Sequence, residues 1–187
     1  MSTALATQPD MTRAAAFHAS QLQPRRADRG FTLIELLIVV ALIGVIASIA
    51  IPSLISARAA ANEASAIGSS RTASSGQNAY AGTCGSGFYA PSAVQLTLAG
   101  FASSDFALPV KHGFAYALSV GDTGVLGPAD CNGDPTVSDF YYSATPTTPD
   151  LGRRGFAVTE DGGIWVDSAG VAPVEPFVIG GTIAPLR

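Results

Sequence analysis

The residue that most needs a chemical explanation is Glu35, because it stands alone inside a long apolar segment. Residues 31–51 read FTLIELLIVVALIGVIASIAI and carry no other charge. At about 1.5 Å per residue, a helix of this length crosses a hydrocarbon layer of about 30 Å. A charged side chain in a membrane helix costs about 2.5 to 3.5 kcal/mol at the centre and less near the interface, so it usually marks a function or a partner.

A partner for Glu35 arises if the chain is cut between Gly30 and Phe31. The cut would create a new amine at Phe31, four residues before Glu35. Residues four apart lie on one face of a helix. The ammonium and the carboxylate could then neutralise each other, within one chain or between two chains.

Two simpler interpretations compete with this one. A secretory signal also has basic residues before an apolar core, but that core has about 7 to 15 residues and ends in a small-residue cleavage site. The present segment is longer and continues into Pro52 and an alanine-rich stretch. A plain membrane anchor fits the length of the segment but leaves Glu35 unexplained.

The residues around this point closely resemble the precursor signal of the type IV pilin family and its pseudopilin relatives. The signature of that family is Gly, then Phe, then Thr-Leu-Ile-Glu and an apolar helix that ends near a proline. The matching residues here are Gly30, Phe31, Thr32, Leu33, Ile34, Glu35 and Pro52. Residues 58–73 also look like the continuation of this helix in one bacterial branch of the family.

The resemblance implies a processing pathway and a set of partners. Prepilin peptidase, a membrane aspartyl protease, would cut after Gly30 and methylate the new amine of Phe31. Glu35 would pair with the amine of a neighbouring subunit during assembly. The implied partners are identical or related pilin subunits in a helical polymer, the peptidase, an inner-membrane assembly platform with its ATPase, and the membrane before assembly; no cofactor is implied.

Two functions share this chemistry. A type IV pilus subunit would act outside the cell in adhesion, motility or DNA uptake, whereas a type II secretion pseudopilin would form a short periplasmic filament for protein export. We favour the pilus. Either protein would start as a single-pass inner-membrane precursor with a cytoplasmic N-terminus, and would end in a cell-surface pilus or a periplasmic pseudopilus.

An anchored enzyme or binding domain is a third class of function. It predicts no processing at Gly30 and an active site in the rest of the chain. The sequence has no nucleotide loop, zinc-ligand spacing or nucleophile elbow. His112, beside Lys111, is most simply a surface residue. We therefore expect no enzymatic activity.

The organisation of the chain follows from the same segment. We expect residues 1–30 to be a leader that is removed, starting at Met1 or Met11, and its arginines place it in the cytoplasm. Residues 31–52 would form the membrane and filament-core helix, 53–82 its distal half and 83–187 a globular region. The formal net charge is −4, and four arginines against two aspartates in the leader leave −6 on the remainder. No nucleic-acid partner is evident from this charge.

The helix is expected to continue beyond Pro52, because residues 57–66 are rich in alanine. Pro52 and, more weakly, Gly44 would be positions where the helix kinks. We expect the helix to end between Asn78 and Gly82. A stripe at helical spacing in this poorly apolar part of the helix is expected to pack closely against a sheet; it consists of Ala60, Ala64 and Ile67.

The predicted fold class is α+β, with three or four antiparallel strands packed on the distal half of the helix. Residues 91–100 predict a short helix capped by Ser92 and stopped by Gly100. Strand-like segments follow at 114–120 and 139–144. The clearest hairpin spans 155–167, with its turn at Asp161-Gly162-Gly163.

Cys84 and Cys131 are the only cysteines, and the globular region is expected outside the cytoplasm. A disulfide between them is therefore the natural prediction. Closing a loop of about 48 residues would stabilise the fold by about 4 kcal/mol in the chain-entropy model.

The loop that contains Cys131 also offers a weak calcium candidate. Asp130, Asn132 and Asp134 follow the spacing of calcium-loop ligands. The sixth and twelfth positions hold Pro135 and Tyr141 instead of Gly and Glu, with Asp139 as a substitute ligand. We favour a polar turn and no metal. Asp122, Asp130, Asp139 and Asp150 are interpreted as scattered, solvated carboxylates.

Overall fold

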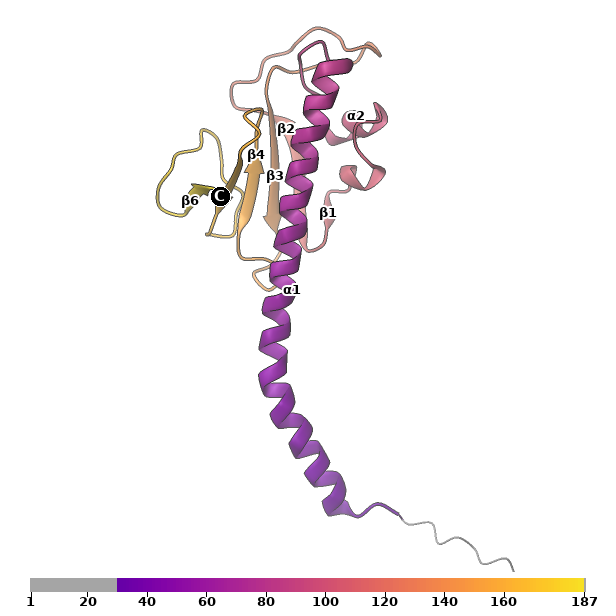
Figure 1. The fold of residues 1–187 in the computed structure, drawn as a ribbon, viewed down its shortest axis with the longest axis vertical. Helices are drawn as coiled ribbons and strands as arrows, with labels where there is room; N and C mark the ends of the chain where they lie inside the picture. The colour runs from indigo at the N-terminus through magenta and orange to yellow at the C-terminus, as the bar shows by residue number, and fades with distance from the viewer. Residues whose placement is uncertain (1–29, 187) are drawn as a thin grey trace, which may run out of the picture. The chain divides into compact units, whose positions relative to one another are not determined.

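The computed structural model describes residues 30–186, so the expected leader lies outside the described residues except for Gly30. The chain divides into two compact units, residues 1–41 and 42–187, which are described separately. The described part of the first unit contains the start of a long helix. The second unit contains the rest of that helix, a sheet and two short helices (Figure 1).

The long helix, α1, spans Leu33–Thr83 and continues through both Gly44 and Pro52. This confirms the predicted continuation; a kink at either position stays a prediction. The helix ends at Thr83, one residue beyond the predicted range. Among the described residues, α1 is the helix long and apolar enough to cross a membrane.

The face of α1 that packs against the sheet differs from the predicted one. Ala60 and Ala64 are exposed and Ile67 is half-buried. The buried residues are instead Ala59, Glu63, Ala66, Ser70, Ala73, Gly76, Gln77 and Tyr80. The prediction was wrong by one position, because the buried face includes the charged Glu63, whose carboxylate is paired with a distant segment.

The sheet has six strands rather than three or four. They are β1 (Val110–Lys111), β2 (Phe114–Val120), β3 (Phe140–Pro146), β4 (Gly155–Val158), β5 (Ile164–Asp167) and β6 (Ile183–Pro185). Each strand pairs antiparallel with the next one along the chain. The additional strands β1 and β6 have two and three residues, too few to produce an alternating pattern, and β6 ends in a proline.

The predicted strands and the short helix are in place. Strand β2 has the predicted bounds, and β4 and β5 form the predicted hairpin with Gly162 at φ +73° in its turn. Helix α2 (Ala93–Leu98) begins after Ser92, whose hydroxyl accepts a hydrogen bond from the Gln95 amide. A 3₁₀ helix, η1 (Ser104–Ala107), follows α2.

One aromatic-rich core joins these elements in the second unit. Figure 1 shows the strands running along the distal part of α1. The large core side chains come from α1, α2, η1 and the sheet; they are Tyr80, Leu96, Phe106, Phe114, Tyr116, Phe140, Tyr142 and Phe156. The small buried residues of α1, such as Ala66 and Ala73, let these rings approach its backbone.

Candidate processing and assembly site

The predicted cleavage position lies in non-helical, exposed backbone just before α1. Gly30 and Phe31 have no regular secondary structure, and the Phe31 side chain is 86% exposed. A backbone bond inside a helix is held by hydrogen bonds, whereas exposed irregular backbone is open to proteolysis. The Gly30–Phe31 bond is therefore placed where a protease can reach it.

Thr32 starts the helix, a role that the sequence analysis missed. Its Oγ1 accepts a hydrogen bond from the Glu35 amide at 3.2 Å, and its carbonyl accepts one from the Leu36 amide at 3.3 Å. The signal was the Thr-x-x-Glu pattern of a helix capping box. Glu35 is thus the third residue of α1, where the positive end of the helix dipole favours its negative charge.

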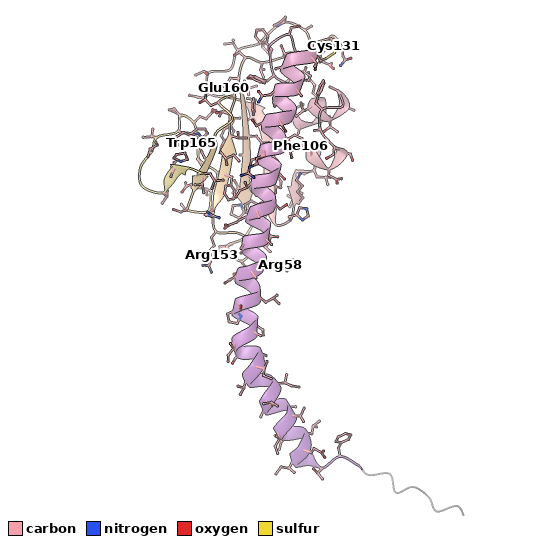
Figure 2. All side chains as sticks on the ribbon, viewed as in Figure 1. Arg58, Phe106, Cys131, Arg153, Glu160 and Trp165 are labelled. Atoms are coloured by element: carbon pink, nitrogen blue, oxygen red, sulfur yellow. A yellow bond between two sulfur atoms is a disulfide. The ribbon has the colours of Figure 1, made fainter. Side chains whose placement is uncertain are left out.

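The helix that follows presents apolar side chains without cover in the structure (Figure 2). Exposed side chains include Leu33, Ile34, Leu36, Leu37, Ile38, Val39, Val40, Leu42, Ile43, Val45, Ile46, Ile49, Ile51, Leu54 and Ile55. A continuous apolar surface of this size is typical of contact with lipid or with other helices. The start of α1 is therefore suited to a membrane or to packing in an assembly.

Further along α1, the buried carboxylate of Glu63 holds the loop between β3 and β4. Glu63 Oε1 accepts hydrogen bonds from the Arg153 and Arg154 amides at 2.8 and 3.1 Å. Glu63 Oε2 accepts from Arg154 Nε and lies 2.8 Å from Arg154 Nη2. This contact is not predictable from local sequence, because Glu63 lies 91 positions from Arg154 in the chain.

Cys84 and Cys131 form a disulfide, with their Cα atoms 4.9 Å apart. Cys84 is the first residue after α1, and Figure 2 places Cys131 beside that end of the helix. The Cys131 amide also donates to the Cys84 carbonyl at 3.0 Å. The disulfide thus ties the loop before β3 to the end of α1.

The neighbouring aspartate loop is held by its own contacts. Asp130 Oδ1 accepts from the Asn132 and Asp134 amides, each at 2.8 Å, and Oδ2 accepts from the Tyr80 hydroxyl at 2.7 Å. The Tyr80 hydrogen bond lowers the pKa of Asp130, and burial raises the pKa of Tyr80 to about 12. The polar-turn interpretation accounts for these contacts.

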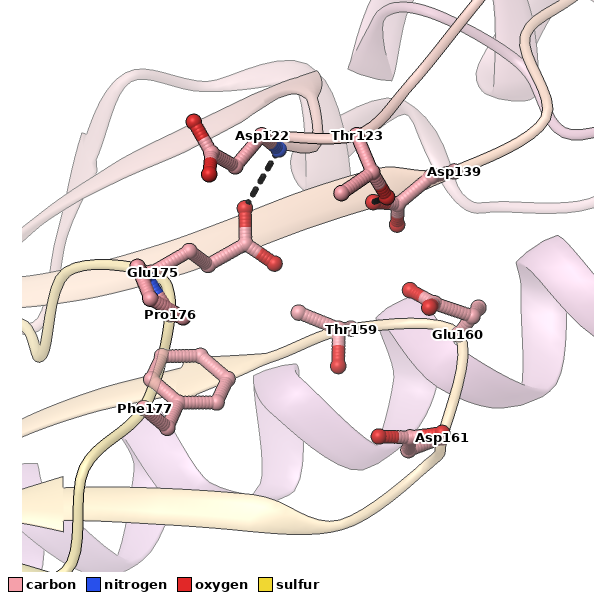
Figure 3. A pocket seen from close by; sticks show the side chains of 9 residues that line it. All are labelled: Asp122, Thr123, Asp139, Thr159, Glu160, Asp161, Glu175, Pro176 and Phe177. Carbon is pink, nitrogen blue, oxygen red and sulfur yellow. Dashed lines mark hydrogen bonds between the residues drawn. The ribbon is translucent and has the colours of Figure 1, made fainter.

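Asp139 does not join that loop. It lines a separate cavity with Asp122, Glu160, Asp161 and Glu175 (Figure 3). The calcium candidate thereby loses the ligand expected from Asp139. Within residues 30–186, the structure contains no group of three or more His, Cys, Asp or Glu side chains arranged to hold a metal ion.

The interpretation of the aspartates as scattered and solvated was wrong for Asp130 and Asp139. These side chains are 8% and 5% exposed. Both are drawn inward by hydroxyl donors from distant segments, Tyr80 for Asp130 and Thr123 for Asp139. His112 is exposed, as expected, in the turn between β1 and β2.

Comparison with known proteins supplies one match. Residues 25–51 match the family model described as the prokaryotic N-terminal methylation motif. This range contains the Gly30–Phe31 bond, the Thr32 cap and Glu35, together with most of the exposed apolar part of α1. No curated protein and no solved structure gives a significant match to the chain.

Proposed function

We propose that this chain is a structural subunit of a type IV pilus. The premise is that residues 25–51 are the prepilin-type signal of type IV pilins and pseudopilins. The signal implies a precursor that is processed by prepilin peptidase and assembled into a polymer. Proteins with this signal are generally structural rather than enzymatic. Adhesion, motility and DNA uptake are the functions that such a filament performs.

In the proposed sequence of events, the precursor enters the inner membrane with residues 1–30 in the cytoplasm. Cleavage after Gly30 removes this leader, and the amine of Phe31 is methylated. Residues 31–52 then leave the membrane for the filament core, driven by an assembly platform and its ATPase. The globular region, which follows residue 82, faces outward.

The observation that carries this proposal is the abrupt change in side-chain exposure along α1. Its large apolar side chains are exposed as far as Ile55, whereas residues from Ala59 to Tyr80 contribute to the core of the globular region. When only one part of an apolar helix is covered by the protein, the uncovered part needs another apolar environment. Lipid before assembly and neighbouring helices after it offer similar surroundings, so the transfer need not expose the helix to water for long.

Glu35 favours the movement of the processed subunit from the membrane into the filament. The uncut precursor carries a carboxylate without the amine that cleavage creates, whereas a processed subunit offers both groups. In the apolar filament core, pairing Glu35 with the Phe31 amine of a neighbour removes the cost of an isolated buried charge. Processing would therefore precede assembly.

The proposal is tested by Glu35→Ala in the natural host, with Leu36→Ala as a matched control. We expect Glu35→Ala to enter the membrane fraction normally but to give at least a tenfold lower yield of sheared surface filaments, because the Phe31 amine loses its partner. Leu36→Ala removes a similar number of atoms and keeps the carboxylate, so most of its yield should remain. Normal filament yield from Glu35→Ala would reject the pairing mechanism.

A comparison of the wild type with a deletion strain separates the two filament classes. Surface filaments visible by electron microscopy support the pilus, which the disulfide and the alanine-rich continuation of α1 favour. A secretion pseudopilin would be identified instead if the wild type has no surface filaments and a deletion strain loses protein export.

A further inference from the structure

An acidic cavity lies at one end of the sheet, outside the processing and assembly site. Its volume is about 200 Å³, and its wall carries the carboxyl groups of Asp122, Asp139, Glu160, Asp161 and Glu175 (Figure 3). These residues come from the β2–β3 connection, the β4–β5 turn and the segment after β5. No lysine, arginine or histidine is among the described residues that line it.

Asp139 is the buried centre of this cavity. It is 5% exposed, and its Oδ2 accepts a hydrogen bond from the Thr123 hydroxyl at 3.1 Å. Its Oδ1 is buried and has no hydrogen-bond partner in the described structure. A Cβ atom at Gly121 would overlap this carboxyl group, so glycine at that position makes room for it. A buried carboxylate oxygen without a donor is costly.

Glu160 can supply the missing donor only as a carboxylic acid. Its carboxyl group points at Asp139 from the β4–β5 turn, within hydrogen-bonding reach (Figure 3). Two ionised carboxylates in contact would repel each other, and neither could donate a hydrogen. One proton between them removes the repulsion and satisfies Oδ1 of Asp139.

We propose that Glu160 keeps a proton that it donates to Asp139, and that this contact is a pH-sensitive lock between the segment just before β3 and the β4–β5 turn. With the proton in place, the turn is held against the sheet by a carboxyl–carboxylate hydrogen bond. When the proton leaves, the two groups repel and the turn is released. The lock responds to the pH of the compartment that contains the globular region.

The groups that face the pair favour retention of the proton. Asp161 adjoins Glu160 in the turn, Asp122 and Glu175 lie across the cavity, and the Tyr89 phenol faces the pair from the segment after α1. The hydrogen bond to Asp139, followed by burial, raises the pKa of Glu160 to about 7. Burial likewise raises the pKa of Glu175 and of Tyr89.

The sign of the pH dependence follows from this raised pKa. Between the ordinary glutamate pKa of about 4.5 and about 7, the folded protein holds a proton that the unfolded chain has lost. The contribution to stability is therefore fully present below about pH 4.5 and lost as the pH rises through about 7. A carboxylate held by a salt bridge would give the opposite slope.

The test is urea unfolding of the full chain in detergent micelles with EDTA, between pH 5 and 8. Trp165, the only tryptophan, lies in β5 directly after the turn and reports the transition by fluorescence. Linkage to one proton predicts that the unfolding equilibrium constant of the wild type rises by up to about tenfold per pH unit below pH 7. Glu160→Gln should have a clearly shallower slope, because its amide donates to Asp139 at every pH.

A matched control separates the lock from the general charge of the cavity. Asp161→Asn removes one charge from the same cavity but keeps the Asp139–Glu160 pair, so it should retain most of the wild-type slope. If Glu160→Gln does not fold, Asp139→Asn replaces it, because the asparagine amide can donate to Glu160. A Glu160→Gln or Asp139→Asn slope equal to that of the wild type would overturn the proposal, as would a wild-type slope that appears only without EDTA.

Discussion

Glu35 and Glu63 are two carboxylates on α1 whose surroundings call for different partners. Glu35 lies in the first turn among exposed apolar side chains, and its amide rather than its carboxylate contacts Thr32. Glu63 is 7% exposed, and its two oxygens accept from two backbone amides and the Arg154 guanidinium. The first carboxylate is available for a partner outside the chain, and the second already has its partners within it.

Glu63→Ala should destabilise the globular region by about 2 kcal/mol, because it leaves two part-buried backbone amides and the Arg154 guanidinium without their acceptor. Arg154→Ala should cost less, about 1 kcal/mol, since the arginine side chain is 43% exposed and the backbone amides still hold Glu63. Urea unfolding of the full chain in micelles at pH 6 provides both values. A Glu63→Ala variant no less stable than Arg154→Ala would contradict the assigned role of the carboxylate.

Sequence reasoning at this scale worked where the information is local. The Gly30-Phe31 junction and Glu35 fall within six consecutive residues, so their spacing alone predicts a role. The Glu63–Arg154 pair and the Asp139–Glu160 contact join segments far apart in the chain. Neither contact could be predicted, because a single sequence does not specify which distant segments fold together.

At the scale of elements, some strands of the sheet have a recognisable sequence pattern and others do not. The seven residues of β2 and the Gly-rich turn between β4 and β5 are strong local signals. Strand β4 is buried along its whole length, so it appears as a short apolar run without alternation. Strands β1 and β6 are defined mainly by pairing with a neighbour, which explains why the sequence predicted too few strands.

Strand β4 also contains a position where only glycine fits. A Cβ atom on Gly155 would collide with the backbone at Val171 and Ala172, whereas on Gly163 its nearest neighbour would be Trp165 Nε1 at 3.9 Å. Gly155→Ala should therefore cost about 2 kcal/mol through forced backbone shifts. Gly163→Ala should change stability by less than about 1 kcal/mol. The urea unfolding midpoints of the two variants are compared. Equal loss of stability in both would show that the backbone contact at Gly155 relaxes without cost.

At the scale of the whole molecule, the chain has two groups of apolar side chains, one buried in the protein and one exposed. One lies within the second unit, where α1, the short helices and the sheet share an aromatic core closed by a disulfide. The other is the exposed surface between Phe31 and Ile55, which includes the end of the methylation motif. In our account, the first group makes the subunit fold and the second makes it enter a membrane and then a filament.

The central claim, that cleavage at Gly30 precedes assembly, is tested most directly by mass spectrometry of the N-terminal peptide from shear-purified surface filaments. The account predicts that this peptide begins at Phe31 and carries one methyl group on its amine. Filaments built from chains that retain residues before Phe31 would contradict it.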